Sequence, residues 1–172
     1  GARPVAVAMD EQGLDPDALE RTLTNLRGQG IRPKFLYTMP TFHNPRGVTM
    51  PTERRRRLVA VAQAAGLPMI EDDAYGDLRF SGERLPTLYS LDDSGLVIYL
   101  STFSKILAAG LRLGWATAAP EVIAKLTLLK NDTGSNPFGQ HMTEVFARSG
   151  ALAAHIERLT GAYRHKRHLL LA

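Results

Sequence analysis

Cysteine is absent from the 172-residue sequence, which excludes disulfides, thiolate metal sites and a cysteine nucleophile. The sequence also has no hydrophobic run long enough to span a bilayer, and no secretory signal is recognisable at its start. Apolar residues make up 44% and charged residues 22%, an ordinary balance for a globular domain of this length. We therefore expect one folded domain in the cytoplasm.

Acidic residues are slightly outnumbered, and the formal net charge is +4. The excess comes partly from two basic clusters, at residues 54–57 and 164–168. Such clusters can bind nucleic acid. The first one runs directly into Leu58, Val59 and Val61, however, and has neither interleaved aromatic residues nor zinc-ligand spacing. We interpret both clusters as solvated helix faces, and expect neither nucleic acid nor a membrane as partner of this segment.

Short apolar segments alternate with helical patterns along the chain. Asp15 before Pro16 is a typical helix start, and Gly66 is a typical helix end. The predicted strands span residues 3–9, 34–39, 67–73, 96–102 and 112–118. The predicted helices run from 16 to a glycine at 28 or 30, from about 51 to 65, and over most of the chain from 120, with breaks at 131–137 and 149–150. The pattern predicts an α/β fold: a mostly parallel sheet with helices on both faces.

One predicted strand breaks the parallel pattern. The connection from Thr102 to Arg112 is too short to hold a crossover helix, so the strand at 112–118 should run antiparallel to its predecessor. No internal repeat, low-complexity segment or domain boundary is visible.

Polar residues gather where three predicted strands end. In open α/β sheets, ligands bind at the carboxyl ends of the parallel strands. The residues at these ends are Asn44 after the second strand, Asp72 and Tyr75 after the third, and Thr102, Ser104 and Lys105 after the fourth. Their convergence on one rim predicts a binding site.

Lys105 stands among small and hydroxyl-bearing residues rather than in a charged surface run. Most lysines are simply exposed surface residues, but here Thr102 and Ser104 supply hydroxyls and Arg112 follows seven residues on. Hydroxyl donors and a guanidinium suit a phosphate dianion. A buried amine beside such groups can have its pKa lowered enough to act as a nucleophile on an aldehyde, which is what a Schiff-base lysine requires.

Asp72 is one of three consecutive acids. A buried carboxylate can keep the proton on a pyridine nitrogen, and pyridoxal phosphate acts as an electron sink only while that nitrogen is protonated. Strand alternation sends neighbouring side chains to opposite faces, so the three acids cannot all face one ligand. For Glu71 and Asp73 we expect a structural role, either capping a following turn or pairing with surface arginines.

Asn44 and Tyr75 supply an amide and a phenol, groups that can hold the ring hydroxyl of pyridoxal phosphate. Each signal is weak alone, because asparagine before proline is common in loops and a tyrosine is more often a core residue.

Three motifs together resemble the fold-type I, class I and II aminotransferases. "FHNPRGVTM" is similar to the family's NPTG element, "EDDAYGDLRF" to its D-x-x-Y element, and "STFSKILAAGLRLGW" to its lysine loop. They occur in the family's order, and the resemblance covers essentially the whole chain. The residues of these motifs most resemble the 2-aminoadipate, kynurenine and broad-specificity branch of the family.

The resemblance implies a role for each matching residue. Lys105 matches the Schiff-base lysine, Asp72 the partner of the pyridine nitrogen, and Asn44 and Tyr75 the ligands of the ring hydroxyl. Thr102, Ser104 and Arg112 match the phosphate ligands. Two positions depart from the family pattern, since Arg46 replaces the threonine of NPTG and Ala109 replaces a proline of the lysine loop.

The resemblance also implies a pyridoxal-phosphate aminotransferase that acts on an amino acid and a 2-oxo acid, as a homodimer when full length. Residues 1–172 would form part of the cofactor-binding large domain, with the N-terminal glycine-rich loop and the small C-terminal domain lying outside. Two alternatives stay open: a pyridoxal-phosphate lyase on the same fold, and the sensor domain of a GntR-type transcriptional regulator. The segment "EDDAYGDLRF" favours a free-standing enzyme.

Overall fold

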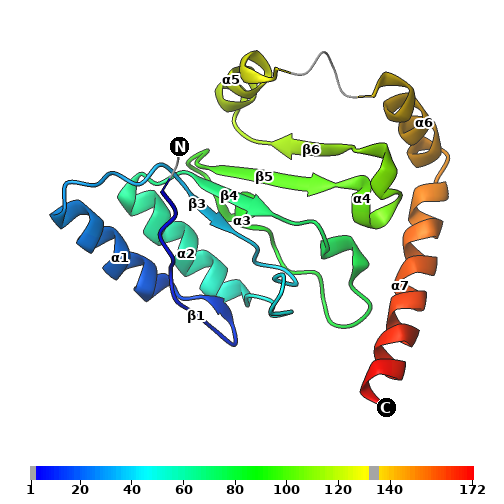
Figure 1. Cartoon of the computed structure of the whole chain (residues 1–172), viewed down its shortest axis with the longest axis horizontal. Helices are drawn as coiled ribbons and strands as arrows, with labels where there is room; N and C mark the ends of the chain where they lie inside the picture. Colours follow the sequence, from blue (N-terminus) through cyan, green and yellow to red (C-terminus); the bar gives the residue numbers. More distant parts are fainter. Residues whose placement is uncertain (1–2, 132–135) are drawn as a thin grey trace.

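A four-stranded sheet forms the centre of the computed structural model, which describes residues 3–131 and 136–172 (Figure 1). Its strands are β3 (Leu36–Thr38), β4 (Met69–Asp72), β5 (Val97–Thr102) and β6 (Gly114–Thr117), in that order across the sheet. Strands β3, β4 and β5 are parallel, whereas β6 runs antiparallel to β5. The predicted mostly parallel sheet with one antiparallel strand is confirmed.

Helices α1 (Pro16–Gly28), α2 (Thr52–Ala65) and α3 (Leu88–Leu91) lie on one side of this sheet. The side chain of Asp15 accepts a hydrogen bond from the Asp17 amide at the start of α1, and α2 ends at Gly66 in the left-handed conformation. Leu58 and Ala62 of α2 share the hydrophobic core with Met69 of β4 and Val97 of β5. The core therefore lies between the helices and one face of the sheet.

The two faces of the sheet differ in burial. Met69 and Glu71 of β4 are fully buried on the core face, whereas Ile70 and Asp72 are only partly buried on the opposite face. This alternation follows from strand geometry, which points successive side chains to opposite sides. Asp72 therefore belongs to the more open face.

The strand predicted at residues 3–9 is wrong. Only β1 (Met9–Asp10) pairs there, with β2 (Gly13–Leu14), in a small antiparallel hairpin. Residues 3–8 pair with no strand in the described chain, and Val5 is 46% exposed. Ala6 and Ala8 offer little apolar area, so this segment gains little from burial.

The basic cluster at 54–57 is not a solvated face throughout. Arg55 is fully buried, and its guanidinium donates to the carbonyl oxygens of Met50, Pro86 and Pro40 and to the Thr41 hydroxyl. Arg54 pairs with Asp10, 2.8 Å away, and anchors the β1–β2 hairpin. Both arginines serve the fold, so the solvated interpretation holds only for the exposed Arg56 and Arg57.

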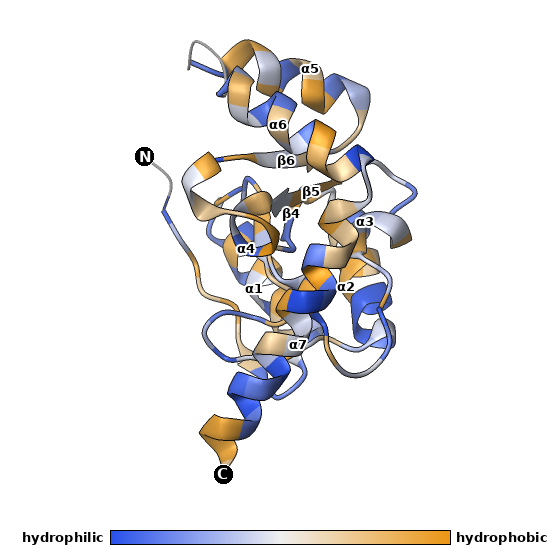
Figure 2. Cartoon of the chain, turned by 90° about the vertical axis from the view of Figure 1, so that its right-hand side faces the viewer, coloured by the Kyte–Doolittle hydropathy of each residue, from blue (hydrophilic) through white to orange (hydrophobic). Residues whose placement is uncertain are grey.

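Three helices follow β6: α5 (Pro120–Leu129), α6 (Pro137–Arg148) and α7 (Ala151–Leu171). The predicted break at 149–150 is confirmed, and part of the predicted break at 131–137 lies outside the described residues. Figure 2 shows α5 and α6 beside β6 and hydrophobic residues at the C-terminal end of α7. Over the two described ranges, no helix combines the length and apolar character needed to cross a membrane.

Candidate active site

The carboxyl ends of β4 and β5 lie side by side, because Asp72 pairs with Leu100 in the parallel ladder. Tyr75 follows β4 directly, and Lys105 lies on the one-turn helix α4 (Phe103–Ile106) that follows β5. The Nζ atom of Lys105 is 6.0 Å from the centre of the Tyr75 ring. The fold therefore brings together the lysine and the phenol that the sequence placed 30 positions apart.

Thr102 shapes the loop that carries Lys105. It is the N-cap of α4: its Oγ1 accepts a hydrogen bond from the Ser104 amide at 3.1 Å, and the two hydroxyl oxygens are 3.0 Å apart. The same Oγ1 lies 3.0 Å from the carbonyl oxygen of Leu113, which precedes β6. The hydroxyl pair is thus held at the start of the lysine helix by contacts to both ends of the loop.

Arg112 ends the short 3-10 helix η2 (Ala109–Leu111) with a left-handed backbone, at φ 54° and ψ 38°. Its side chain is exposed, and Nη1 donates to the Ala109 carbonyl at 3.3 Å. Lys105 is exposed as well, so the expectation of a buried amine at this position is wrong for the described chain. Across residues 3–131 and 136–172, neither cation forms an ion pair with an acidic side chain, so both charges remain available to an anionic ligand.

Asp72 accepts a hydrogen bond that the sequence did not predict. The hydroxyl of Tyr37, on the neighbouring strand β3, donates to Oδ2 of Asp72 at 2.6 Å. Burial, and then the hydrogen bond to Asp72, raise the pKa of Tyr37 to about 12. Tyr37 and Asp72 are 35 positions apart, so the sequence does not reveal this contact, although both residues lie on predicted strands.

Glu71 and Asp73 point to the other face of the sheet. Glu71 accepts hydrogen bonds from the Leu88 and Tyr89 amides at 2.8 and 2.9 Å, at the first turn of α3. Burial raises the pKa of Glu71 to about 7. Oδ2 of Asp73 accepts the Tyr99 hydroxyl at 3.0 Å, and burial together with that carboxylate raises the pKa of Tyr99. The expected capping role is confirmed for Glu71, whereas Asp73 pairs with a tyrosine rather than an arginine.

Asn44 sits in a tight loop after β3. The His43 amide donates to the Val48 carbonyl at 2.8 Å, and the Gly47 amide donates to the His43 carbonyl at 2.6 Å. The Asn44 side chain is exposed and forms no hydrogen bond with Asp72, Tyr75 or Lys105 among the described residues. The structure therefore places Asn44 after a strand end but shows no hydrogen bond that joins it to the others.

A cation–π contact joins the Asn44 loop to the segment after Tyr75. The guanidinium of Arg79 lies 4.5 Å over the centre of the Phe42 ring, a typical cation–π distance. Phe42 is two residues before Asn44 and has a positive φ of 49°, which is unusual for a bulky residue. Nothing in the sequence motif signalled this contact, because the two residues lie on different loops.

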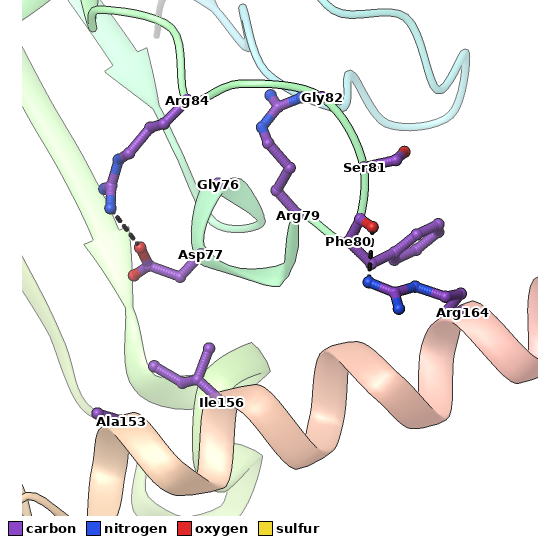
Figure 3. Close-up of a pocket in the computed structure, with 10 residues that line it drawn as sticks. All are labelled: Gly76, Asp77, Arg79, Phe80, Ser81, Gly82, Arg84, Ala153, Ile156 and Arg164. Carbon is purple, nitrogen blue, oxygen red and sulfur yellow. Dashed lines mark hydrogen bonds and ion pairs between the residues drawn. The ribbon is translucent and has the colours of Figure 1, made fainter.

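A cavity of about 520 Å³ lies beside the site, between the segment 76–84 and α7 (Figure 3). Its three arginines do not converge on one point in Figure 3. Arg84 pairs with Asp77 at 3.1 Å, and Arg164 donates to the Phe80 carbonyl at 2.8 Å. The cavity begins one residue after Tyr75 but contains none of the predicted site residues.

Comparison with known proteins identifies the family and the fold. The family model "Aminotransferase class I and II" matches residues 1–170. Aromatic-amino-acid aminotransferase 1 of Thermococcus litoralis is 41% identical over 97% of this chain, and 2-aminoadipate transaminase of Thermus thermophilus is 38% identical over 99%. The crystal structure of Pyrococcus horikoshii kynurenine aminotransferase superposes with a TM-score of 0.93, at 40% identity over 97% of this chain.

The chain spans only part of these proteins: 40% of the Thermococcus relative, 43% of the Thermus relative and 42% of the Pyrococcus chain. Within that span, 97% or more of this chain aligns with each of the three proteins. The chain belongs to the class I and II aminotransferase family.

Proposed function

We propose that the protein is a pyridoxal-phosphate-dependent aminotransferase, which moves an amino group from an amino acid to a 2-oxo acid. The observation that carries the proposal is the position of Lys105. It is an exposed amine just past the carboxyl end of β5, 6.0 Å from the Tyr75 ring and free of any acidic partner in the described chain. The crystal structure of the related Pyrococcus enzyme is a complex with PMP.

The residues around Lys105 fit the chemistry of this cofactor. Asp72 offers a carboxylate for the pyridine nitrogen, and Tyr75 and Asn44 offer donors for the ring hydroxyl. Thr102 and Ser104 offer hydroxyls 3.0 Å apart, and Arg112 offers a guanidinium with no acidic partner in the described segments. A phosphate dianion is bound well by this combination of hydrogen-bond donors and positive charge.

When bound, pyridoxal phosphate supplies an aldehyde that condenses with amines and a ring that accepts electron density. We assign the protein's own steps to three sets of groups. The Lys105 amine would take the proton from the α-carbon of the amino acid as general base and deliver it, as general acid, to the cofactor carbon that carries the amino group; with the 2-oxo acid the same transfer would run in reverse. Asp72 holds the proton on the pyridine nitrogen. Thr102, Ser104 and Arg112 fix the phosphate, and so orient the reacting carbon toward Lys105.

The wider parts of the proposal concern the whole protein. We propose that residues 1–172 are part of the cofactor-binding large domain, and that the complete protein is a cytoplasmic homodimer. The support is the family match together with the share of the relatives' length that the chain spans.

The test is to trap the cofactor on the full-length protein with borohydride. We expect the label on Lys105, and we expect Lys105→Ala to abolish it. Lys125→Ala, on the exposed surface of α5, is the matched control and should leave the label intact. Trapping at a different lysine would overturn the assignment.

Product analysis separates the alternatives. Transfer of the amino group to a 2-oxo acid supports the aminotransferase. Elimination without transfer indicates a lyase on the same fold, and trapping without any turnover indicates the sensor domain of a GntR-type regulator.

A further inference from the structure

We propose that Tyr37 is a positioning residue that holds Asp72 with one carboxylate oxygen facing the pyridine nitrogen of the cofactor. The role rests on the proposed function, because it assigns to Tyr37 the orientation of a residue that touches the cofactor. Neither the sequence motifs nor the family resemblance pointed to this tyrosine.

The geometry begins with strand register. Tyr37 of β3 pairs with Ile70 of β4, and Asp72 lies two residues further along the same strand. Residues two apart on a strand share a face, so Tyr37, Ile70 and Asp72 all lie on the more open face of the sheet. From there the Tyr37 hydroxyl donates to Oδ2 of Asp72 at 2.6 Å, a short hydrogen bond.

This bond fixes the orientation of the carboxylate. It occupies Oδ2 and restrains the rotation of the group, which leaves Oδ1 without a hydrogen-bond partner among the described residues. The pKa of Tyr37 is about 12, so the phenol remains a donor at neutral pH.

A purely structural role explains the tyrosine poorly. Tyr37 is 53% exposed, so its ring contributes little to the core, whereas its hydroxyl makes a short, directed contact. The titratable groups that face the Tyr37 hydroxyl are Asp72 from β4 and Tyr75 from the segment after β4. The hydroxyl is therefore directed at residues proposed to hold the cofactor.

The chain offers a matched control on the opposite face of the same sheet. The Tyr99 hydroxyl donates to Oδ2 of Asp73 at 3.0 Å, so Tyr99→Phe removes the same kind of bond from the neighbouring acid. Tyr37→Phe and Tyr99→Phe each keep the ring and lose one phenol hydroxyl. Only the first should affect the cofactor.

The experiment uses the full-length protein loaded with pyridoxal phosphate labelled with ¹⁵N in the pyridine ring. The nitrogen chemical shift reports protonation directly and does not depend on turnover. We expect Tyr37→Phe to lower the pH at which the nitrogen loses its proton, and to lower kcat about tenfold with little change in KM. Tyr99→Phe should match the wild type in both measurements.

A double-mutant cycle completes the test. In the Asp72→Asn background, Tyr37→Phe should have almost no further effect, since its target carboxylate is gone. If the nitrogen is protonated in the wild type, but Tyr37→Phe and Tyr99→Phe change its chemical shift equally or not at all, this inference alone is overturned. A wild-type nitrogen that is not protonated would overturn the proposed function together with the inference.

Discussion

At the residue scale, three consecutive acids at the end of β4 have three different environments. Glu71 caps α3, Asp73 accepts the Tyr99 hydroxyl, and Asp72 accepts the Tyr37 hydroxyl on the opposite face. Strand alternation separates Asp72 from Glu71 and Asp73, which share the core face. The chemistry of the segment therefore depends on register, and a shift by one residue would exchange the roles.

Substitution of single acids tests that register. Asp72→Asn should lower kcat of the full-length enzyme by about two orders of magnitude or more, because a neutral amide no longer stabilises a proton on the pyridine nitrogen. Asp73→Asn should cost less than about tenfold, since its amide oxygen can still accept the Tyr99 hydroxyl. Steady-state kinetics of the two variants measure the difference, and equal losses would show that Asp72 is not the partner of the nitrogen.

The sequence reveals the candidate site residues better than it reveals their partners. Lys105, Asp72 and Tyr75 could be named because motif chemistry and strand ends are local features. Tyr37 and Arg55 could not be interpreted correctly, since their partners lie 35 residues away in one case and up to 31 in the other. Arg55 and the exposed Arg56 are both arginines with an arginine on either side, so only the packed fold distinguishes them.

At the element scale, Glu71 links the central sheet to α3. Its carboxylate is fully buried and satisfies the first amides of a four-residue helix, which has little stability of its own. Burial raises the pKa of Glu71 from 4.5 to about 7. The folded state therefore binds this proton more tightly than the unfolded state does.

The consequence is a pH-dependent stability with a definite sign. A raised pKa in the folded state contributes stability that is fully present below about pH 4.5 and is lost as pH rises through about 7. Glu71→Gln removes the titration, so the stability of this variant relative to wild type should increase between about pH 5 and pH 8, by roughly 3 kcal/mol at most. Thermal or denaturant unfolding of both proteins at the two pH values measures the change. A difference that is flat or falls with pH would contradict the burial of a titrating Glu71.

Helices and strands were predicted correctly where the hydrophobic pattern was long or where residues typical of helix ends marked the boundaries. Helices α1 and α2 begin and end within a residue or so of their predicted bounds, because Asp15, Pro16 and Gly66 are clear boundary signals. The strand at residues 3–9 failed because β propensity alone cannot supply a partner strand. The one-turn helix α3 was missed because it depends on Glu71, which lies 17 residues upstream.

At the scale of the whole molecule, much apolar surface is uncovered. The exposed fraction is 84% for Leu128 of α5, 75% for Phe138 of α6 and 85% for Leu170 of α7. Exposed apolar side chains on three consecutive helices are typical of surfaces that another part of a protein, or another subunit, covers. The larger part of the Thermococcus relative also has no counterpart in this chain.

These features predict that the 172-residue chain will not transaminate by itself. The proposed site residues would hold a cofactor and move a proton, but none of them is proposed to bind the substrate carboxylate, because Arg112 is proposed for the phosphate. Orientation of the substrate is worth several kcal/mol of the reaction barrier, so its loss should reduce turnover by orders of magnitude even where cofactor binds. We also expect the isolated chain to self-associate through the apolar residues of α5, α6 and α7, which size-exclusion chromatography measures. The decisive assay incubates the purified chain and the full-length protein, side by side, with pyridoxal phosphate, an amino acid and a 2-oxo acid. If the two rates agree within about tenfold, the 172 residues contain a substrate-orienting group that the proposed site lacks.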